Sequence, residues 1–532
     1  MASSPQAFME KQKAWLVGIA LAAILICAAV LRLAHLRSVP GWYSDEGNFI
    51  DFAAQISQGK WQNFCTSGAP HIDRLPVYMY LLAAGIRIFG TDIAVSRGLS
   101  AISAIASAGL LYLLVSKICG KKLGLLSSAI FAVLPWAVVY NRLGLTYNLM
   151  SPLFLLTLLA TWNFLQKPSL KWMALAAVPA GLAFGTDYLG VVAILLATGV
   201  WFLKGWRWLV VGATAFFLTM ALILAPPLWM APKVFWQDVV MTLTSRSGIT
   251  ASGSVLLNLA INFTELLRRE SWVFVGICGL FLLPDRRLRG LTLAGTGITL
   301  LAITRSFAPV GRSLHYLIHL FPFFALGMAA FFTQAARRAY HAILDLWQGL
   351  EGALPWLARR ASFWASARKA TLWLSMGFLF GGPALWMIMA STALVATGNE
   401  FLLHGDNDHN LTPAAEAGEV IQYLASHSQP DDLVLASPHL AWAAPTERKA
   451  DFRNQQTYDN LLAGTSLHLP RERFLYPCGV EDATYVILDP LGRDFAPRVL
   501  PGMEGTIKKV ESWPVVFQTD SLALYQNPAK VH

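Results

Sequence analysis

The sequence has few charged residues. Asp, Glu, Lys and Arg make up 14% of its 532 residues, while 55% are hydrophobic; a typical globular domain is roughly 25% charged. The mean hydropathy is +0.49. So little charge cannot cover the surface of a water-soluble globule of this size, and the apolar content excludes disordered and collagen-like chains. We therefore expect a multi-pass membrane protein.

Cysteine is also scarce, with five residues and no C-x-x-C or metal-like spacing. This excludes a scaffold built on disulfides. Cys27, Cys119 and Cys278 fall in apolar runs, where they are expected to act as small core residues. Cys65 and Cys478 fall outside such runs, and a disulfide between them requires that both face an oxidising compartment.

Several nucleotide and hydrolase motifs are missing. The sequence contains no Walker-type Gly-Lys-Ser/Thr loop, no G-x-G-x-x-G that opens a helix, no H-E-x-x-H and no G-x-S-x-G in a suitable context. It therefore supports neither a nucleotide-driven pump nor an enzyme that uses soluble nucleotide sugars.

The two parts of the chain carry opposite charge. Residues 1–398 hold 31 Lys and Arg against 13 Asp and Glu, whereas residues 399–532 hold 10 against 18. The basic residues cluster in short stretches between apolar runs, so the positive-inside rule explains them better than nucleic-acid binding does. We expect no nucleic-acid partner.

Placing these basic clusters on the cytoplasmic side predicts about eleven spans. The N-terminus is then cytoplasmic and the C-terminus extracytoplasmic. The first apolar run is long for a signal peptide and lacks a small-x-small cleavage site, so we interpret it as an uncleaved span. The predicted spans are residues 14–35, 94–116, 123–140, 149–166, 172–186, 189–203, 208–230, 271–284, 290–304, 311–334 and 371–397.

Two long outer loops, residues 36–93 and 231–270, complete the predicted membrane domain of residues 1–398. The apolar segment 76–90 is too short to span and is expected to be a juxtamembrane or re-entrant helix. Residues 337–370, rich in Arg, Ala and Trp, are expected to form an amphipathic interfacial helix on the inner side.

Residues 399–532 are predicted to form a small extracytoplasmic α/β domain. Thr412-Pro413 is typical of a helix start, and the helix is expected over 413–427. Four short β-like runs follow, separated by Asp-Pro, Pro-Gly and Ser-Gln-Pro turns. These runs are residues 433–436, 485–488, 515–517 and 522–525.

The first outer loop contains adjacent carboxylates, Asp45 and Glu46, about ten residues after the first span. Carboxylates near a membrane surface can serve as general bases or as ligands of a divalent cation. The alternative is a solvated acidic turn. In the same loop, Arg74 follows Asp73 and can hold a lipid phosphate, or can simply extend to the interface.

More ionisable or polar residues lie where predicted spans end on the outer side. Charged groups at membrane depth are costly, so they indicate functional sites by default. Their gathering on one side of the membrane favours a shared site over scattered structural ion pairs. These residues are Arg142, Asp187, His315 and Tyr316.

Five motifs in this order resemble the GT-C superfamily of membrane glycosyltransferases. Within it, the likeness is to bacterial relatives of the protein O-mannosyltransferases and of the lipid A aminoarabinose transferase, over about residues 14–335 in pattern. The motifs are Ser44-Asp45-Glu46-Gly47, Asp73-Arg74-Leu75-Pro76 with Tyr78 and Tyr80 followed by Phe89-Gly90 and Ala94-Val95-Ser96-Arg97, Arg142 to Asn148, Gly181 to Thr186, and His315-Tyr316-Leu317 with Pro322.

The resemblance implies an inverting transfer of a sugar from a polyprenyl-phosphate donor to an acceptor hydroxyl on the outer face of the membrane. Asp45 would be the general base, and Arg74 with His315 and Tyr316 would bind the donor phosphate. The acceptor would be a protein, a lipid or a cell-envelope polysaccharide. The C-terminal domain would contact the acceptor or cover the site.

Two positions depart from the family pattern. Asn148 stands where the family often has Asp, and Asp187 stands where it often has Lys or another residue. A divalent metal and the identity of the sugar are therefore left open. Asp187 is either a second acidic group of the site or a turn cap. A transporter or flippase of lipid-linked saccharides is the alternative function, although no repeated halves support it.

Overall fold

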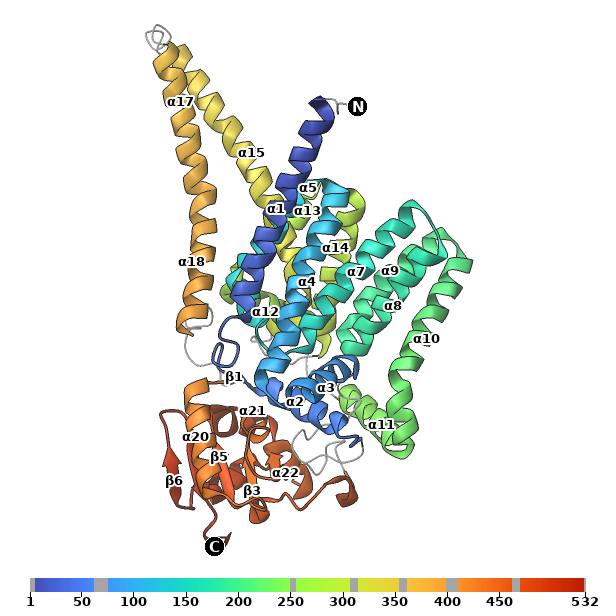
Figure 1. The fold of residues 1–532 in the computed structure, drawn as a ribbon, viewed down its shortest axis with the longest axis vertical. Coiled ribbons are helices and arrows are strands. Elements are labelled where there is room, and N and C mark those ends of the chain that lie inside the picture. The colour runs from blue at the N-terminus through green and yellow to red at the C-terminus, as the bar shows by residue number, and fades with distance from the viewer. Residues whose placement is uncertain are drawn as a thin grey trace.

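The computed structural model describes residues 5–61, 75–248, 255–306, 314–353, 361–398, 410–461 and 469–530. It is a bundle of long helices with a small sheet domain at one end (Figure 1). We call this end the domain-side end and the opposite one the far end. Helix α1 (Pro5–Leu33) starts at the far end and finishes at the domain-side end. The expected fold class, a multi-pass helical protein with a small sheet domain, is confirmed.

Each predicted span overlaps helix in the described residues, although the span 123–140 is divided between two helices and the span 371–397 runs across two helices and a π-helical turn. Within the described ranges, six helices are long and apolar enough to cross a membrane, and shorter apolar helices accompany them, so the number of crossings stays a prediction. The other bundle helices are α4 (Ile93–Cys119), α5 (Lys121–Val133), α6 (Pro135–Tyr140), α7 (Thr146–Gln166), α8 (Leu170–Thr186), α9 (Val191–Lys204), α10 (Trp206–Met230), α13 (Ser271–Phe281), α14 (Arg286–Ser306), α15 (Phe321–Ala353), α17 (Ala361–Met376) and α18 (Gly382–Thr397).

The centre of the bundle is an apolar core to which α2, α3, α4, α5, α7, α13 and α15 all contribute. Helices α13 and α15 approach closely because glycines face each other there: a Cβ on Gly279 would lie 1.8 Å from the carbonyl oxygen of Gly327. Small residues permit this kind of close helix packing inside membranes. The fully buried side chains of the core include Phe49, Tyr78, Phe131, Phe154 and Phe324.

The prediction of a separate interfacial helix over residues 337–370 is wrong. Helix α15 continues without a break to Ala353, and α17 begins at Ala361. Together with α18 they form a long hairpin that extends past the rest of the bundle at the far end (Figure 1). The segment from Thr333 to Trp347 contains no glycine or proline. Nothing in it interrupts the helix that begins in the bundle.

The first long loop is itself helical. Helix α2 (Ser44–Ser57) carries the adjacent carboxylates of Asp45 and Glu46 in its first turn. Helix α3 (Val77–Phe89) corresponds to the short helix expected over residues 76–90. At 13 residues, α3 is too short to cross a bilayer. Both helices lie at the domain-side end (Figure 1). The second long loop likewise contains α11 (Pro232–Gly248) and α12 (Val255–Arg269).

The C-terminal domain has a five-stranded sheet in the order β4-β3-β5-β7-β6. The four predicted runs are β3 (Leu433–Ala436), β5 (Tyr485–Leu488), β6 (Val515–Gln518) and β7 (Ala523–Gln526), and the predicted helix is α20 (Ala414–His427). Strand β3 is parallel to β4 (Arg448–Asp451) and to β5, while β7 is antiparallel to β5 and β6. The sequence pattern missed β4 because its residues, Arg-Lys-Ala-Asp, are mostly polar.

The domain is attached to the first loop by backbone contacts. A two-residue strand, β1 (Trp42–Tyr43), pairs antiparallel with β2 (Leu411–Thr412), so that Trp42 lies opposite Thr412. The short α21 (Pro438–Ala441) lies against α2, where a Cβ on Gly47 would be 2.0 Å from the carbonyl oxygen of Pro438. Only glycine permits this approach, so the domain is seated directly on the helix that carries Asp45.

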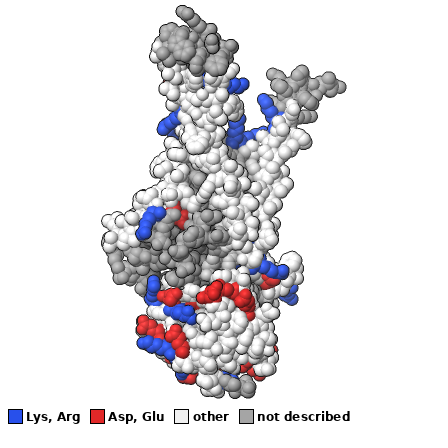
Figure 2. Space-filling view, turned by 90° about the vertical axis from the view of Figure 1, so that its left-hand side faces the viewer, with Lys and Arg blue, Asp and Glu red and all other residues white. Residues whose placement is uncertain are grey.

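A side-chain contact joins the domain to α11. Arg473, on the domain, donates a 2.9 Å hydrogen bond to the carboxylate of Asp238, and both side chains are buried. On the face shown in Figure 2, acidic side chains gather mainly on the C-terminal domain, and basic ones are visible along the upper part of the molecule. This distribution follows the charge asymmetry of the sequence.

Candidate functional site

Asp45 lies in the first turn of α2, at the domain-side end, and its side chain is half-buried. An acidic residue in this position is favoured by the positive end of the helix dipole. The β1–β2 pairing before it and the Gly47 contact after it both hold the turn. Asp45 therefore sits on a fixed segment where the membrane bundle meets the C-terminal domain.

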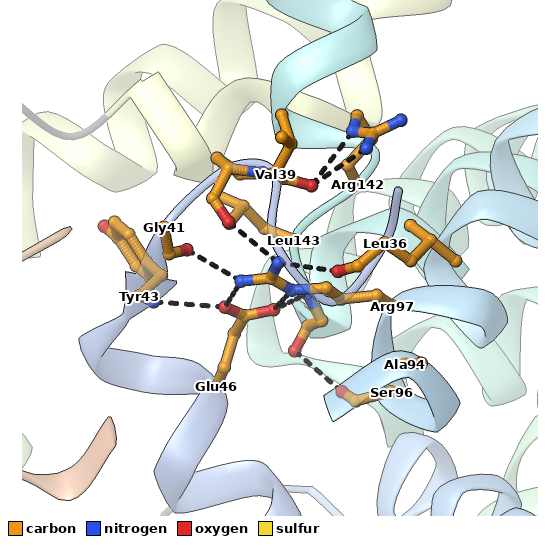
Figure 3. A network of polar contacts seen from close by, with 12 residues as sticks. Leu36, Val39, Gly41, Tyr43, Glu46, Ala94, Ser96, Arg97, Arg142 and Leu143 are labelled. Carbon is orange, nitrogen blue, oxygen red and sulfur yellow. Dashed lines mark hydrogen bonds and ion pairs between the residues drawn. The ribbon is translucent and has the colours of Figure 1, made fainter. Parts of the chain in front are cut away.

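Glu46 is fully buried and paired with Arg97 of α4, which is also fully buried (Figure 3). Arg97 donates from Nε to one carboxylate oxygen at 2.8 Å and from Nη2 to the other at 2.7 Å. The backbone N–H groups of Gly144 and Tyr43 also donate to these oxygens, at 2.7 and 3.1 Å. A bidentate pair of this kind is among the strongest protein hydrogen-bond arrangements.

The remaining donors of Arg97 are occupied by carbonyl oxygens of the first loop. Nη1 donates to Leu36 and Pro40, both at 2.8 Å, and Nη2 donates to Gly41 at 2.7 Å. A catalytic or metal-binding part for Glu46 stays a prediction. Its oxygens already accept four hydrogen bonds, so it serves to hold the loop that leads to Asp45.

Arg142, another candidate residue, is fully buried, and a direct part for it in the site stays a prediction. Its guanidinium donates to the carbonyl oxygens of Leu31 and Val39 at 2.8 and 2.9 Å, and to that of Ala34. The last carbonyls of a helix have no partner within the helix. Arg142 supplies partners at the end of α1 and in the turn that follows it.

Asn148 has a similar set of partners, and a part for it in the site stays a prediction. Its side-chain amide donates to the carbonyl oxygens of Tyr140 and Leu143, both at 2.9 Å, and its own oxygen accepts from Asn141 at 2.7 Å. It is fully buried. All of its contacts stabilise the turn between α6 and α7.

Two buried arginines with several backbone partners were not among the candidate site residues, although Arg97 stood in one of the family motifs. Arg97 is one, and Arg32 is the other: it is fully buried and donates to the carbonyl oxygens of Phe131 and Ala132 near the end of α5, both at 2.8 Å. The sequence could have indicated both residues, since each is a lone arginine inside or at the edge of an apolar run. Such a charge needs several partners within the protein.

His315 and Tyr316 lie beside the segment that leads into α2. The hydroxyl of Tyr43 is 3.2 Å from Nδ1 of His315. The ring of Tyr147 meets Tyr316 edge-on, with centroids 5.3 Å apart, and lies 5.9 Å from the His315 ring. The fold therefore brings His315, which is far from Asp45 in the sequence, against Tyr43, two residues before Asp45. Tyr316 follows His315 and contacts Tyr147.

Asp187 lies at the turn between α8 and the 3₁₀ turn Tyr188–Gly190. Its carboxylate accepts the N–H of Leu189 at 2.9 Å, and it is half-buried. This is the turn-capping arrangement considered in the sequence analysis. A part for Asp187 in the site stays a prediction.

Asp73, Arg74 and Cys65 lie outside the described residues. The flanking residues are placed: Trp61 and Leu75 are buried, and the ring of Trp61 lies 5.8 Å from that of Tyr80 in α3. Within the described ranges, no group of three His, Cys, Asp or Glu is arranged to hold a metal ion.

One stretch of the membrane domain matches a known family model. Residues 73–231 match the family described as dolichyl-phosphate-mannose-protein mannosyltransferase. YkcB from Bacillus subtilis, a relative named as a mannosyltransferase, is 30% identical over 203 residues, which cover 36% of this chain. The chain spans 26% of the length of that curated relative.

The whole chain is similar to a solved structure of ArnT from Cupriavidus metallidurans bound to undecaprenyl phosphate. The TM-score is 0.60 at 15% identity, and the match covers 97% of this chain and 98% of that one. The chain has the GT-C fold. The archaeal oligosaccharyltransferase AglB from Archaeoglobus fulgidus, solved with an inhibitory peptide and a dolichol-phosphate, is similar to it at a TM-score of 0.52. That match is 12% identical and covers 98% of this chain and 75% of AglB.

These similarities confirm the resemblance inferred from the five sequence motifs. In this chain, the GT-C fold places α2 and α3 at one end of the helical bundle, against the C-terminal domain (Figure 1). The candidate residues Asp45, His315 and Tyr316 all lie at that end.

Proposed function

We propose that the chain is an inverting glycosyltransferase that moves a sugar from a polyprenyl-phosphate donor to an acceptor hydroxyl. The observation that carries the proposal is the position of Asp45, a half-buried carboxylate in the first turn of α2 in a chain with the GT-C fold. Asp45 lies two residues after Tyr43, whose hydroxyl is 3.2 Å from Nδ1 of His315. The undecaprenyl phosphate bound by ArnT and the dolichol-phosphate bound by AglB support a lipid-linked donor.

In the proposed reaction, the acceptor oxygen attacks the anomeric carbon of the sugar from the side opposite the lipid phosphate. The carbon–oxygen bond to the phosphate breaks, and the configuration at the anomeric carbon inverts. Asp45 accepts the proton of the attacking hydroxyl, which is a weak nucleophile without a base. The polyprenyl phosphate leaves with the bonding electrons.

The leaving phosphate gains charge as the bond breaks, so donors aimed at it lower the barrier. We assign this contact to Arg74, with His315 and Tyr316. The Tyr43 hydroxyl, 3.2 Å from Nδ1 of His315, orients the imidazole ring. Asp187 is kept as the candidate for a second acidic group of the site.

The surroundings of Asp45 are rigid, which suits a base that must meet a bound hydroxyl at hydrogen-bond distance. The Glu46–Arg97 pair anchors one side of the turn, and the contact between Gly47 and Pro438 anchors the other. The C-terminal domain lies directly on this helix, so we assign it to acceptor contact. The positive-inside pattern of the sequence supports a position outside the cytoplasm for this end.

The proposal is tested by measuring sugar transfer by the protein in proteoliposomes. A panel of polyprenyl-phosphate sugars is offered with cell-envelope extract as acceptor, with and without a chelator. General-base catalysis is worth about 10²–10⁴ in rate, so Asp45→Asn is expected to lose at least a hundredfold. Asp520→Asn, an exposed acid on the C-terminal domain, is the matched control and is expected to keep wild-type activity.

Full activity in Asp45→Asn would overturn the assignment of the base. Movement of lipid-linked sugar across the bilayer without transfer would overturn the transferase proposal in favour of a flippase. Loss of transfer on chelation, restored by a divalent cation, would assign a metal to the site.

A further inference from the structure

A cavity lies away from the Asp45 site, where α5, α15 and the α17–α18 pair diverge. Its volume is about 820 Å³, and it also reaches the end of α13 at Leu282 and Pro284. Figure 1 shows the hairpin of α15 and α17 leaning away from the bundle in this region. A space of this size is large enough for a small organic ligand or part of a lipid.

The walls of this cavity are mostly apolar over the depth of the bundle. Leu123, Leu126 and Ile130 line it from α5 at helical spacing, and Ala384 and Met387 line it from α18. From Lys122 to Ile130 the groove extends about 12 Å along the helix, at 1.5 Å per residue. An occupant must therefore be apolar over roughly this length.

Two cations stand at the end of the groove, close to the far end of the bundle. Lys122 is at the start of α5, Arg337 is on α15, and both line the cavity. Both side chains are exposed, and neither forms an ion pair with any residue in the described ranges. The sequence adds a second basic residue beside each of them, Lys121 and Arg338.

The wall made by α17 and α18 departs from regular helix at the groove. Residues Gly377–Gly381 form a π-helical turn, and Gly382-Pro383 follows. Single π turns inside helices are often found at functional sites. Phe380 of this turn contacts Phe332 of α15, with ring centroids 6.1 Å apart, so the two walls meet within the groove.

We propose that this groove binds an anionic glycerophospholipid from the leaflet at the far end. One acyl chain lies along the apolar wall of α5, and the phosphate group contacts Lys122 and Arg337. Basic pockets between membrane helices bind anionic head groups in this way. The combination of a long apolar wall with two unpaired cations at one end matches a lipid anion. A polar metabolite does not match the apolar lining of the groove.

The full-length protein is tested by native mass spectrometry after incubation with either phosphatidylglycerol or phosphatidylcholine. The wild type is expected to retain phosphatidylglycerol at least tenfold more than phosphatidylcholine. Lys122→Gln with Arg337→Gln should lose that preference. Ala384→Trp, which fills the groove, should reduce retention of both lipids. The matched control is Lys204→Gln with Arg207→Gln, an exposed basic pair between α9 and α10, which should behave as the wild type does.

A second measurement uses only the wild type and so does not depend on the folding of any variant. Phosphatidylglycerol with a photoreactive acyl chain is expected to label peptides containing residues 119–130 and 373–387. Labelling confined to other helices would overturn the proposal. Equal retention of the two lipids by the wild type, or loss of the preference in the control pair, would also overturn it.

Discussion

The guanidinium group of Arg97 donates to both carboxylate oxygens of Glu46, at 2.8 and 2.7 Å, and both side chains are fully buried. The pair joins α4 to the first turn of α2, one residue from Asp45. The two adjacent carboxylates thus lie in different environments. That of Glu46 is enclosed by hydrogen-bond donors, and that of Asp45 is half-buried at the interface of the two domains.

Glu46→Gln is expected to destabilise the protein. The substitution removes the charge that compensates Arg97 inside the bundle, and breaking a buried pair from one side typically costs about 3–5 kcal/mol. Thermal unfolding in detergent should show a clearly lower midpoint for Glu46→Gln. Asp45→Asn should unfold as the wild type does while losing sugar transfer. Equal midpoints for the wild type and Glu46→Gln would contradict the structural assignment of Glu46.

Gly47→Ala is expected to loosen the C-terminal domain. The added Cβ would lie 2.0 Å from the carbonyl oxygen of Pro438, so either α2 or the domain must move. Overpacking of this kind typically costs about 1–3 kcal/mol. Hydrogen exchange should become faster at the β1–β2 pairing, and transfer activity should fall. Gly418→Ala, where a Cβ meets nothing within 4 Å, is the control and should change neither.

Tyr43→Phe is expected to affect donor binding more than turnover. It removes the hydroxyl that lies 3.2 Å from Nδ1 of His315 and leaves the ring in place. A single hydrogen bond is worth about 1 kcal/mol, so the KM for the lipid-linked donor should rise about fivefold with kcat nearly unchanged. A fall in kcat with an unchanged KM would show that the contact does not orient a donor-binding group.

The stability of the protein is expected to depend on pH because of Asp451, a buried residue at the end of β4. Burial raises its pKa from the ordinary 3.8 to about 7, against the opposing effect of the hydrogen bond from the Asn454 N–H. Between pH 4 and 7 the folded state keeps a proton that the unfolded state releases. The free energy of unfolding therefore falls as the pH rises through this window.

Asp451→Asn should remove this fall in the free energy of unfolding with rising pH. Asparagine is neutral and still caps α22 (Phe452–Tyr458). Thermal unfolding of the full-length protein between pH 4 and 8 measures the effect. The exposed-site variant Asp520→Asn should keep the wild-type slope. A slope in Asp451→Asn that equals that of the wild type would place the titrating group elsewhere.

The positions of the helices were predictable because apolar runs must form helices in a membrane, where backbone groups have no water to bond. The error at residues 337–370 came from the polar composition of α15 beyond the bundle. Amphipathic character is compatible both with a helix lying on a membrane surface and with the extension of a span. Strand β4 was missed because its polar residues carry no alternating pattern.

The sequence predicted that the candidate residues gather on one side, but it did not show which of them have backbone partners. Arg142 and Asn148 are polar residues near the ends of spans, as expected of residues in a functional site. In the structure, their N–H groups donate to backbone carbonyl oxygens. Those carbonyls belong to helix ends and turns, and a helix end needs external partners wherever it is buried.

By itself, the sequence determined the class of the protein, the order of its helices and the motifs shared with the GT-C superfamily, because hydropathy and local spacing are properties of short segments. Only the tertiary structure decided that Glu46 is a buried anchor beside the half-buried Asp45. It also brought His315 to Tyr43, and it opened an apolar groove below Lys122 and Arg337. Each of these depends on segments far apart in the chain, and such contacts are set by packing and by the need to satisfy every buried charge.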